Sequence, residues 1–400
     1  MVLEIEFSVL FTTPAQIEYL RQRLAEFEAQ RRIRVNLQIQ DWATGRAELV
    51  KMGLYRYGAD VSDVGSTWIG DFFAMDALRP FTPGEIAALG GGDAFVPAAW
   101  QPGIPVGDSQ VWAIPWVVSP ILIVYRRDLL QRAGVDERAA FQTHAHLEQT
   151  LAQLQASGWD MPLALPVRST RYSTLHNVAS WIWGMGGDIL SQDGKRVVFD
   201  QPTAVTAMRM YYGLARYFSP GFLQSAGKVI QPSLAFWQGQ AAVAVGGSWL
   251  ASTTSSMLPE VRRHLGVARL PGVAFVGAQN LVVWQHSRHP TAAVELANYL
   301  VQPSVQAGYA QALNLLPSSV DLLSAPPYAE DPSGKIMAQA ALSGRAFPTV
   351  SLLGLVEDKL SLALEQTWDD VLANLDGELE SIIYNRMGPL ARRLNLTLQS

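Results

Sequence analysis

The chain of 400 residues has no cysteine and no long apolar run, and each absence excludes a class of structure. Without cysteine, neither a disulfide nor a thiolate metal site can form. The nearest candidate for such a run, Phe236 to Leu250, is interrupted by Gln238, Gln240 and three glycines. It therefore falls short of the roughly 20 residues that span a bilayer.

Charge is also scarce, because charged residues make up 16% of the chain and the formal net charge is −5. Arg31-Arg32 and Arg392-Arg393 are among its few dense basic points. A groove that tracks a nucleic-acid backbone needs more basic residues than these, so we predict no nucleic-acid partner. Hydrophobic residues reach 49%, which allows a large core, and the length suggests about two or three domains.

The chain opens without a recognisable signal peptide, since Met1-Val2 leads directly into the strand-like EIEFSVLF. We therefore expect either a cytosolic protein or an exported one whose targeting segment was removed.

The first part of the chain alternates strand and helix patterns. Residues 4–11, 34–40 and 60–64 are predicted strands, and the segments that begin at Pro14 and Ala43 are predicted helices. Strands that alternate with helices pair in parallel, and ligands bind beyond the carboxyl ends of such strands. Two tryptophans and several hydroxyl side chains follow these three ends, so we expect them to meet on one rim.

Tryptophan is abundant, with twelve residues. Trp42, Trp68, Trp116 and Trp249 each end an apolar run beside Thr, Ser, Pro or Gly. A flat ring with one N–H donor suits a ligand that has an apolar face and hydroxyls, such as a sugar ring. Five others fall in periodic segments or turns and are predicted core or surface residues: Trp112, Trp159, Trp237, Trp284 and Trp368.

Three short crossings marked by proline follow, near Pro115 to Pro120, at Leu270-Pro271 and at Leu316-Pro317. They predict two lobes, each built from discontinuous pieces of the chain, that can rotate about a hinge. We assign residues 1–116 and 270–316 to an N-terminal lobe, and residues 117–269 and 317–400 to a C-terminal lobe.

Five segments in one order resemble the extracellular solute-binding proteins of bacterial ABC importers, in the branch that carries sugars and oligosaccharides. The most specific, SQVWAIPWVVSPILIVYRRDLLQRAGV, is similar to the family stretch G-K-x-Y-G-x-P-W…L-x-Y-N-K-D-L-F-x-x-A-G. The other four segments are residues 60–81, 181–211, 235–250 and 277–319. Two departures stand out. Gln279-Asn280 replaces a Gly-rich turn near the expected cleft, and Arg126-Arg127 replaces Asn-Lys at a position we expect on the surface.

The resemblance implies the periplasmic-binding-protein fold, with two α/β lobes joined by a multi-segment hinge and a ligand trapped between them. It implies a saccharide ligand, delivery to the permease of an ABC transporter, and no enzymatic activity. It also implies a location in the periplasm or on the extracellular face of the membrane, often with a lipid anchor on the precursor. We predict a monomer and no cofactor or metal.

The candidate ligand-binding residues combine indole faces with hydrogen-bonding groups. For every tryptophan a core position is the alternative, and for Asp41 the alternative is the N-cap of the following helix. His176 is a further candidate. The set is Thr13, Asp41, Trp42, Thr67, Trp68, Trp116, Trp183, Ser248, Trp249, Gln279, Asn280 and Arg345.

Two other functions remain open from the residues. A binding protein for an amino acid or a polyamine would need an Arg–carboxylate clamp or several carboxylates among aromatic side chains. A glycosidase would also carry Trp and carboxylates. The sequence has neither a G-x-S-x-G nor an H-E-x-x-H motif.

Overall fold

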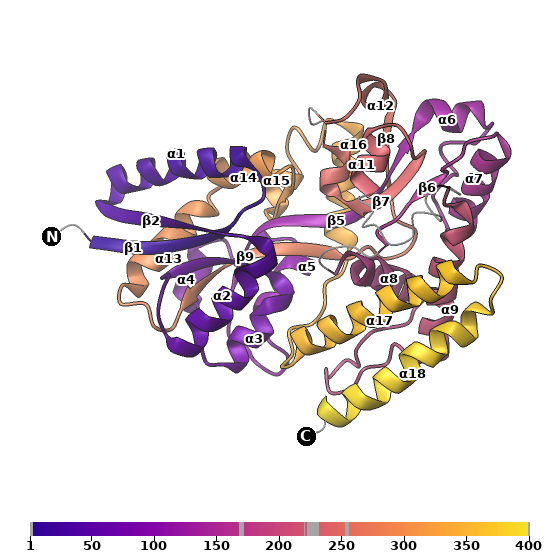
Figure 1. Ribbon diagram of the computed structural model, residues 1–400. Helices are drawn as coiled ribbons and strands as arrows, with labels where there is room; N and C mark the ends of the chain where they lie inside the picture. The colour runs from indigo at the N-terminus through magenta and orange to yellow at the C-terminus, as the bar shows by residue number, and fades with distance from the viewer. Residues whose placement is uncertain (1–2, 168–171, 220, 222–231, 253–255, 399–400) are drawn as a thin grey trace. The chain divides into compact units, whose positions relative to one another are not determined.

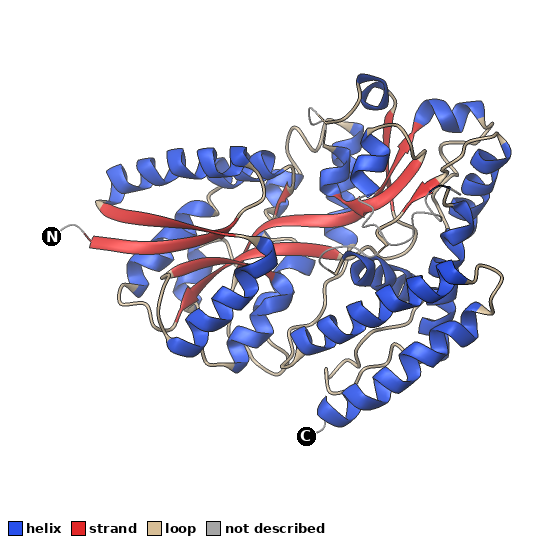
Figure 2. Ribbon diagram, in the orientation of Figure 1, coloured by secondary structure: helices blue, strands red, loops and turns tan. Residues whose placement is uncertain are grey.

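The computed structural model describes residues 3–167, 172–219, 221, 232–252 and 256–398. The chain folds into two compact units, each of which combines strands and helices (Figure 2). Unit 1 comprises residues 1–119, 276–334 and 345–354, and unit 2 comprises residues 120–275, 335–344 and 355–400. Within the described part, no helix is long and apolar enough to cross a membrane.

Unit 1 is built on a sheet in which β1 (Leu3–Leu10) lies between β2 (Ile33–Gln40) and β3 (Val61–Gly65). β1 pairs with both neighbours in parallel, because α1 (Pro14–Arg31) and α2 (Trp42–Tyr55) return the chain to the same end each time. β9 (Val276–Trp284) continues the sheet antiparallel to β3, with Gly65 opposite Gln279. These elements confirm the strand and helix alternation predicted for the first part of the chain (Figure 1).

Helices pack against both faces of this sheet, which gives unit 1 two cores. On one face, α1, α13 (Pro290–Leu300) and α14 (Pro303–Leu313) bury residues such as Leu20, Phe27 and Leu296 against Phe7 and Leu281. On the other face, α2 and α3 (Ile69–Ala74) cover β3 and β9. The shorter elements of unit 1 are β4 (Leu78–Arg79), α4 (Pro83–Ala88), α5 (Pro97–Trp100), β10 (Leu316–Pro317) and α15 (Val320–Leu323).

Unit 2 has a smaller sheet around the second half of β5 (Ile114–Arg126). β7 (Val243–Gly247) and β8 (Leu265–Arg269) pair with β5 in antiparallel fashion, and β6 (Leu163–Ala164) pairs in parallel with β7. The helices of unit 2, two of which begin in unit 1, are α6 (Arg127–Arg132), α7 (His144–Ala156), α8 (Ser173–Gly184), α9 (Pro202–Gly213), α11 (Pro232–Trp237), α12 (Pro259–Arg263), α16 (Pro332–Ser343), α17 (Leu353–Ala373) and α18 (Leu379–Leu398).

Arg126 corrects one expectation from the sequence. It was predicted on the surface, but its side chain is buried. Its guanidinium donates to both oxygens of Asp128, at 2.7 and 2.6 Å, and to Glu260 at 2.9 Å. A buried arginine needs such carboxylate partners, and the Asp-containing stretch after β5 supplies the first.

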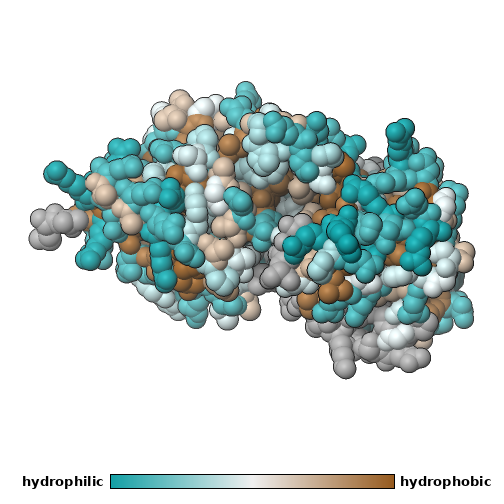
Figure 3. Space-filling view, turned by 90° about the horizontal axis from the view of Figure 1, so that it is seen from above, coloured by the Kyte–Doolittle hydropathy of each residue, from teal (hydrophilic) through white to brown (hydrophobic). Residues whose placement is uncertain are grey.

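The observed units differ from the predicted lobes by small shifts at residues 117–119 and 270–275 and in two longer segments. Residues 317–334 and 345–354, which we assigned to the C-terminal lobe, group with unit 1. Hydrogen bonds hold them there, because Val96 N–H donates to the carbonyl of Ser318 at 2.8 Å and the Thr349 hydroxyl donates to that of Pro102 at 2.6 Å. The face of the molecule in Figure 3 is mostly hydrophilic, with apolar side chains in small patches.

Candidate functional site

The carboxyl ends of the three parallel strands of unit 1 bring two of the predicted tryptophans together. The rings of Trp42 and Trp68 meet edge to face, with centroids 5.5 Å apart and planes at 65°. The indole N–H of Trp42 donates to the Thr12 hydroxyl at 3.1 Å, which ties the end of β2 to the end of β1. Trp42 is partly exposed, whereas Trp68 is buried. Thr67 lies beside Trp68 and is partly exposed.

Thr13 and Asp41, at the same strand ends, cap helices. The Thr13 hydroxyl accepts from Gln16 N–H at 3.0 Å and donates to the carbonyl of Ala312 at 2.8 Å. One carboxylate oxygen of Asp41 accepts from Ala43 N–H at 2.6 Å, which is the N-cap role considered as its alternative. Asp41 is exposed, so capping leaves its side chain open to solvent.

Gln279 and Asn280 reach this region from β9, opposite Gly65 and Val64. Both side chains are buried. Within the described residues, the amide oxygen of Gln279 and both polar side-chain atoms of Asn280 have no hydrogen-bond partner. A buried polar group left without a partner costs about 1–3 kcal/mol, so these atoms are candidates for contact with a polar ligand. Neighbouring strand residues point to opposite faces, and the alternation places Asn280 on the face covered by α2 and α3, where Val282 lies.

Unit 2 repeats the arrangement at the end of β7. Gly247 ends the strand, and Ser248 and Trp249 follow in a 3₁₀ turn (Ser248–Ala251), as Ser66 and Trp68 follow Gly65 in unit 1. The indole of Trp249 lies directly against Gly247, because a Cβ there would be 1.8 Å from a ring carbon. Trp249 is 41% exposed, which leaves indole surface available to a ligand. The segments GSTW and GGSW carry this signal in the sequence.

Three other predicted residues are not part of either tryptophan turn. Trp116 is 0% exposed in the core of unit 1, stacked on Tyr309 with centroids 3.6 Å apart, and its N–H donates to the carbonyl of Leu300. Trp183 is buried in unit 2 and donates to Asp188 at 2.9 Å. The carbonyl of Arg345 accepts from Val276 N–H at 2.8 Å, where two segments of unit 1 begin.

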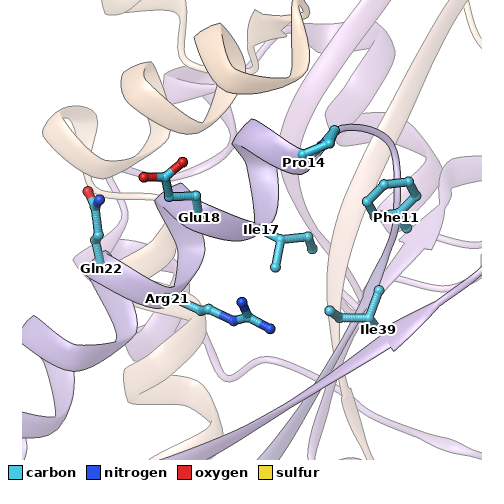
Figure 4. A pocket seen from close by; sticks show the side chains of 7 residues that line it. All are labelled: Phe11, Pro14, Ile17, Glu18, Arg21, Gln22 and Ile39. Carbon is cyan, nitrogen blue, oxygen red and sulfur yellow. The ribbon is translucent and has the colours of Figure 1, made fainter.

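The structure also has a pocket of about 540 Å³ between α1 and β2 that sequence reasoning did not predict. Figure 4 shows Ile17 and Ile39 across it from one another, with Phe11 and Pro14 at one end. Phe11 and Ile39 are exposed, and polar side chains line the other end. Its largely apolar lining offers contact area but few directional groups.

Comparisons with known proteins agree with this architecture. A family model described as "Bacterial extracellular solute-binding protein" matches residues 22–336. The diacetylchitobiose binding protein DasA of Streptomyces coelicolor is 22% identical over 312 residues, which are 75% of this chain and 69% of the relative. The sugar-binding protein MalE from Xanthomonas citri has a TM-score of 0.83 at 22% identity, over 99% of this chain and 97% of the other.

A further solved structure, an ABC transporter solute-binding protein from Thermotoga lettingae bound to α-D-tagatose, has a TM-score of 0.80. It is 20% identical and covers 99% of this chain and 100% of the other. These likenesses confirm the predicted fold, a periplasmic-binding-protein fold with two α/β lobes.

Proposed function

The chain belongs to the family of bacterial extracellular solute-binding proteins, and we propose that its ligand is a monosaccharide or an oligosaccharide. The observation that carries the proposal is the tryptophan turn found once in each unit, Gly65 to Trp68 and Gly247 to Trp249. The indole of Trp249, packed on the Gly247 backbone, is held rigidly, so its exposed surface can stack on the C–H face of a pyranose with little loss of side-chain entropy. Trp68 is buried, and it would act by supporting the ring of Trp42.

Hydroxyl groups of the sugar would satisfy the buried polar atoms of Gln279 and Asn280. We propose that each unit carries its own saccharide-contacting residues. Trp42, Thr67, Trp68, Gln279 and Asn280 would act from unit 1, and Ser248 and Trp249 from unit 2. A ligand-binding role stays a prediction for Thr13, Asp41, Trp183 and Arg345. We leave Trp116 out of the proposed site because it is fully buried in the core of unit 1.

The relatives support a saccharide over other solutes, since one is named for diacetylchitobiose and a structural neighbour holds α-D-tagatose. We propose that the protein acts as a monomer outside the cytoplasm, where a lipid anchor on its precursor would hold it at the membrane. There it would deliver the sugar to the permease of an ABC transporter, without chemical turnover.

A thermal-shift screen tests the proposal. A saccharide present at 100 times its Kd should stabilise the protein by about 2.7 kcal/mol, which is a clear rise in Tm. The screen should contain diacetylchitobiose, maltotetraose and tagatose, with an amino acid and a polyamine as competing solute classes. Stabilisation by a competing class and by none of the sugars would overturn the saccharide proposal. Chromatography of the incubated sugars should show no product, and a product would favour the glycosidase.

Removal of the exposed indole should weaken binding. Trp249→Ala is expected to raise the Kd for the best saccharide about 5- to 13-fold, because loss of a stacking contact of roughly 1–1.5 kcal/mol corresponds to such a factor. Trp159→Ala is the matched control, since Trp159 is another partly exposed tryptophan of unit 2. Isothermal titration calorimetry gives both values. Equal affinities for the two variants would remove Trp249 from the site.

Gly247→Ala tests the position of the same ring without removing it. The new methyl group would overlap the indole of Trp249, so the ring must move, and we expect a loss of affinity similar to that of Trp249→Ala. Gly388→Ala in α18 serves as the control, because its Cβ would find its nearest atom at an ordinary contact distance of 3.6 Å. Unchanged affinity in Gly247→Ala would show that the placement of this indole is not needed for binding.

A further inference from the structure

Glu357, in the second turn of α17, is an unusual carboxylate of unit 2. Its side chain is 1% exposed, and among the described residues neither carboxylate oxygen has a hydrogen-bond partner. The imidazole of His176 lies beside it, with Nε2 at 4.0 Å from Oε1 of Glu357. That distance is too long for a direct hydrogen bond.

Other acidic side chains of the same helix have partners. Asp358, the next residue, accepts a hydrogen bond from the Tyr172 hydroxyl. Asp370 receives two from Arg386, at 2.7 and 3.0 Å. Burial of a carboxylate without donors costs several kcal/mol, and proteins retain such a group where it has a function. Glu357 therefore needs an explanation that the fold alone does not supply.

His176 is held in a fixed orientation beside Glu357. Its ring stacks on Phe275, with centroids 3.9 Å apart and planes at 9°. Phe275 is in turn anchored through its backbone N–H, which donates to the Ser180 hydroxyl at 2.9 Å. The imidazole keeps some exposure, with 24% of its side-chain surface open. An imidazole held in this way next to a carboxylate can form hydrogen bonds with a polar ligand without first having to be ordered.

We propose that Glu357 and His176 form a recognition site on unit 2 for adjacent hydroxyl groups of a saccharide. Two hydroxyls would donate to the two oxygens of Glu357, and the imidazole would exchange a further hydrogen bond with one of them. A diol suits this place because each hydroxyl can donate to one carboxylate oxygen, and a hydroxyl can also accept from the imidazole. The inference rests on the proposed function, and it adds two residues of unit 2 that would form hydrogen bonds with hydroxyl groups of the sugar.

Glu357→Gln in the full chain tests the site in two ways. Without ligand, the substitution removes a buried carboxylate whose oxygens have no hydrogen-bond partner among the described residues, so the Tm should rise by about 2–4 °C. With diacetylchitobiose, maltotetraose or tagatose, whichever stabilises the wild type most, the Kd should rise about 10- to 100-fold, the factor for a hydrogen bond to a charged group. His176→Gln should also raise the Kd.

Glu365→Gln provides the matched control, because Glu365 lies in the same helix and is partly exposed. It should change neither the Tm nor the Kd appreciably. A lower Tm for Glu357→Gln together with an unchanged Kd would show that Glu357 is structural and would overturn the inference, while wild-type binding still upheld the proposed function. If the wild type binds none of the three sugars, the proposed function fails, and this inference fails with it.

Discussion

Replacement of Trp116 by alanine is expected to destabilise unit 1 by about 3–5 kcal/mol, the range for removal of a large aromatic side chain from a core. The indole is 0% exposed and stacks on Tyr309 with planes at 7°. It also contacts Phe7, with centroids 6.0 Å apart. Alanine would leave a cavity between the sheet and α14. It would also leave the carbonyl of Leu300 without the hydrogen bond that it now accepts from the indole N–H at 3.1 Å.

Chemical denaturation followed by circular dichroism measures this effect, and Trp42→Ala is the comparison. Trp42 is partly exposed, so its removal should cost much less stability while it weakens saccharide binding. Trp116→Ala should therefore lose mainly stability, whereas Trp42→Ala should lose mainly affinity for the saccharide. A Trp116→Ala protein that is as stable as the wild type but no longer binds sugar would restore the ligand-binding role predicted from the sequence.

Trp116 also shows why the sequence could not separate core from site. Its local context, an apolar strand interrupted by Pro115, is compatible with a cleft or with a core. The deciding partner, Tyr309, lies far along the chain in α14, and no local pattern connects the two. Glu357 was missed for a related reason. An acidic residue on an amphipathic helix suggests solvent, but Glu357 is 1% exposed and lies 4.0 Å from His176 of α8, which is distant in sequence.

Local periodicity did predict the elements that position the rim. The alternating pattern of β1, α1, β2, α2 and β3 follows from short-range spacing, and parallel pairing then brings the strand ends together. The C-terminal helices α17 and α18 are separated by a short break that contains Gly377. The unit to which each late segment belongs is harder to predict from the sequence. Residues 345–354 join unit 1 through hydrogen bonds with residues distant in sequence, such as that from Thr349 to Pro102.

The largest pH effect is expected at Asp63, on β3 behind the tryptophan turn of unit 1. The carboxyl is buried on the face of the sheet that α1 and α14 cover. The Tyr309 hydroxyl lies near enough for the charge of Asp63 to raise the pKa of Tyr309. It accepts one hydrogen bond, from Leu10 N–H at 3.3 Å, and its other oxygen has no partner among the described residues. Burial raises the pKa of Asp63 to about 8, and the Leu10 N–H only partly opposes this rise.

The sign follows from the two pKa values. Asp63 has a pKa of about 3.9 in the unfolded chain, so the folded state binds the proton more tightly. Its contribution to stability is complete below about pH 4, falls as the pH rises, and is lost once the pH passes about 8. At about 1.4 kcal/mol for each pH unit, the loss across this interval is roughly 5 kcal/mol.

Asp63→Asn should therefore flatten the dependence of the unfolding free energy on pH between about 5 and 8, and should make the protein more stable than the wild type at pH 8. Asp60→Asn is the control. Asp60 accepts from Glu6 N–H at 2.8 Å and from the Ser287 hydroxyl at 2.6 Å, so its replacement should lower stability and keep the wild-type slope due to Asp63. Urea denaturation at several pH values decides the matter. A wild-type stability that rises from pH 5 to 8, with Asp63→Asn parallel to it, would mean that Asp63 is ionised in the folded protein and that β3 carries a buried charge.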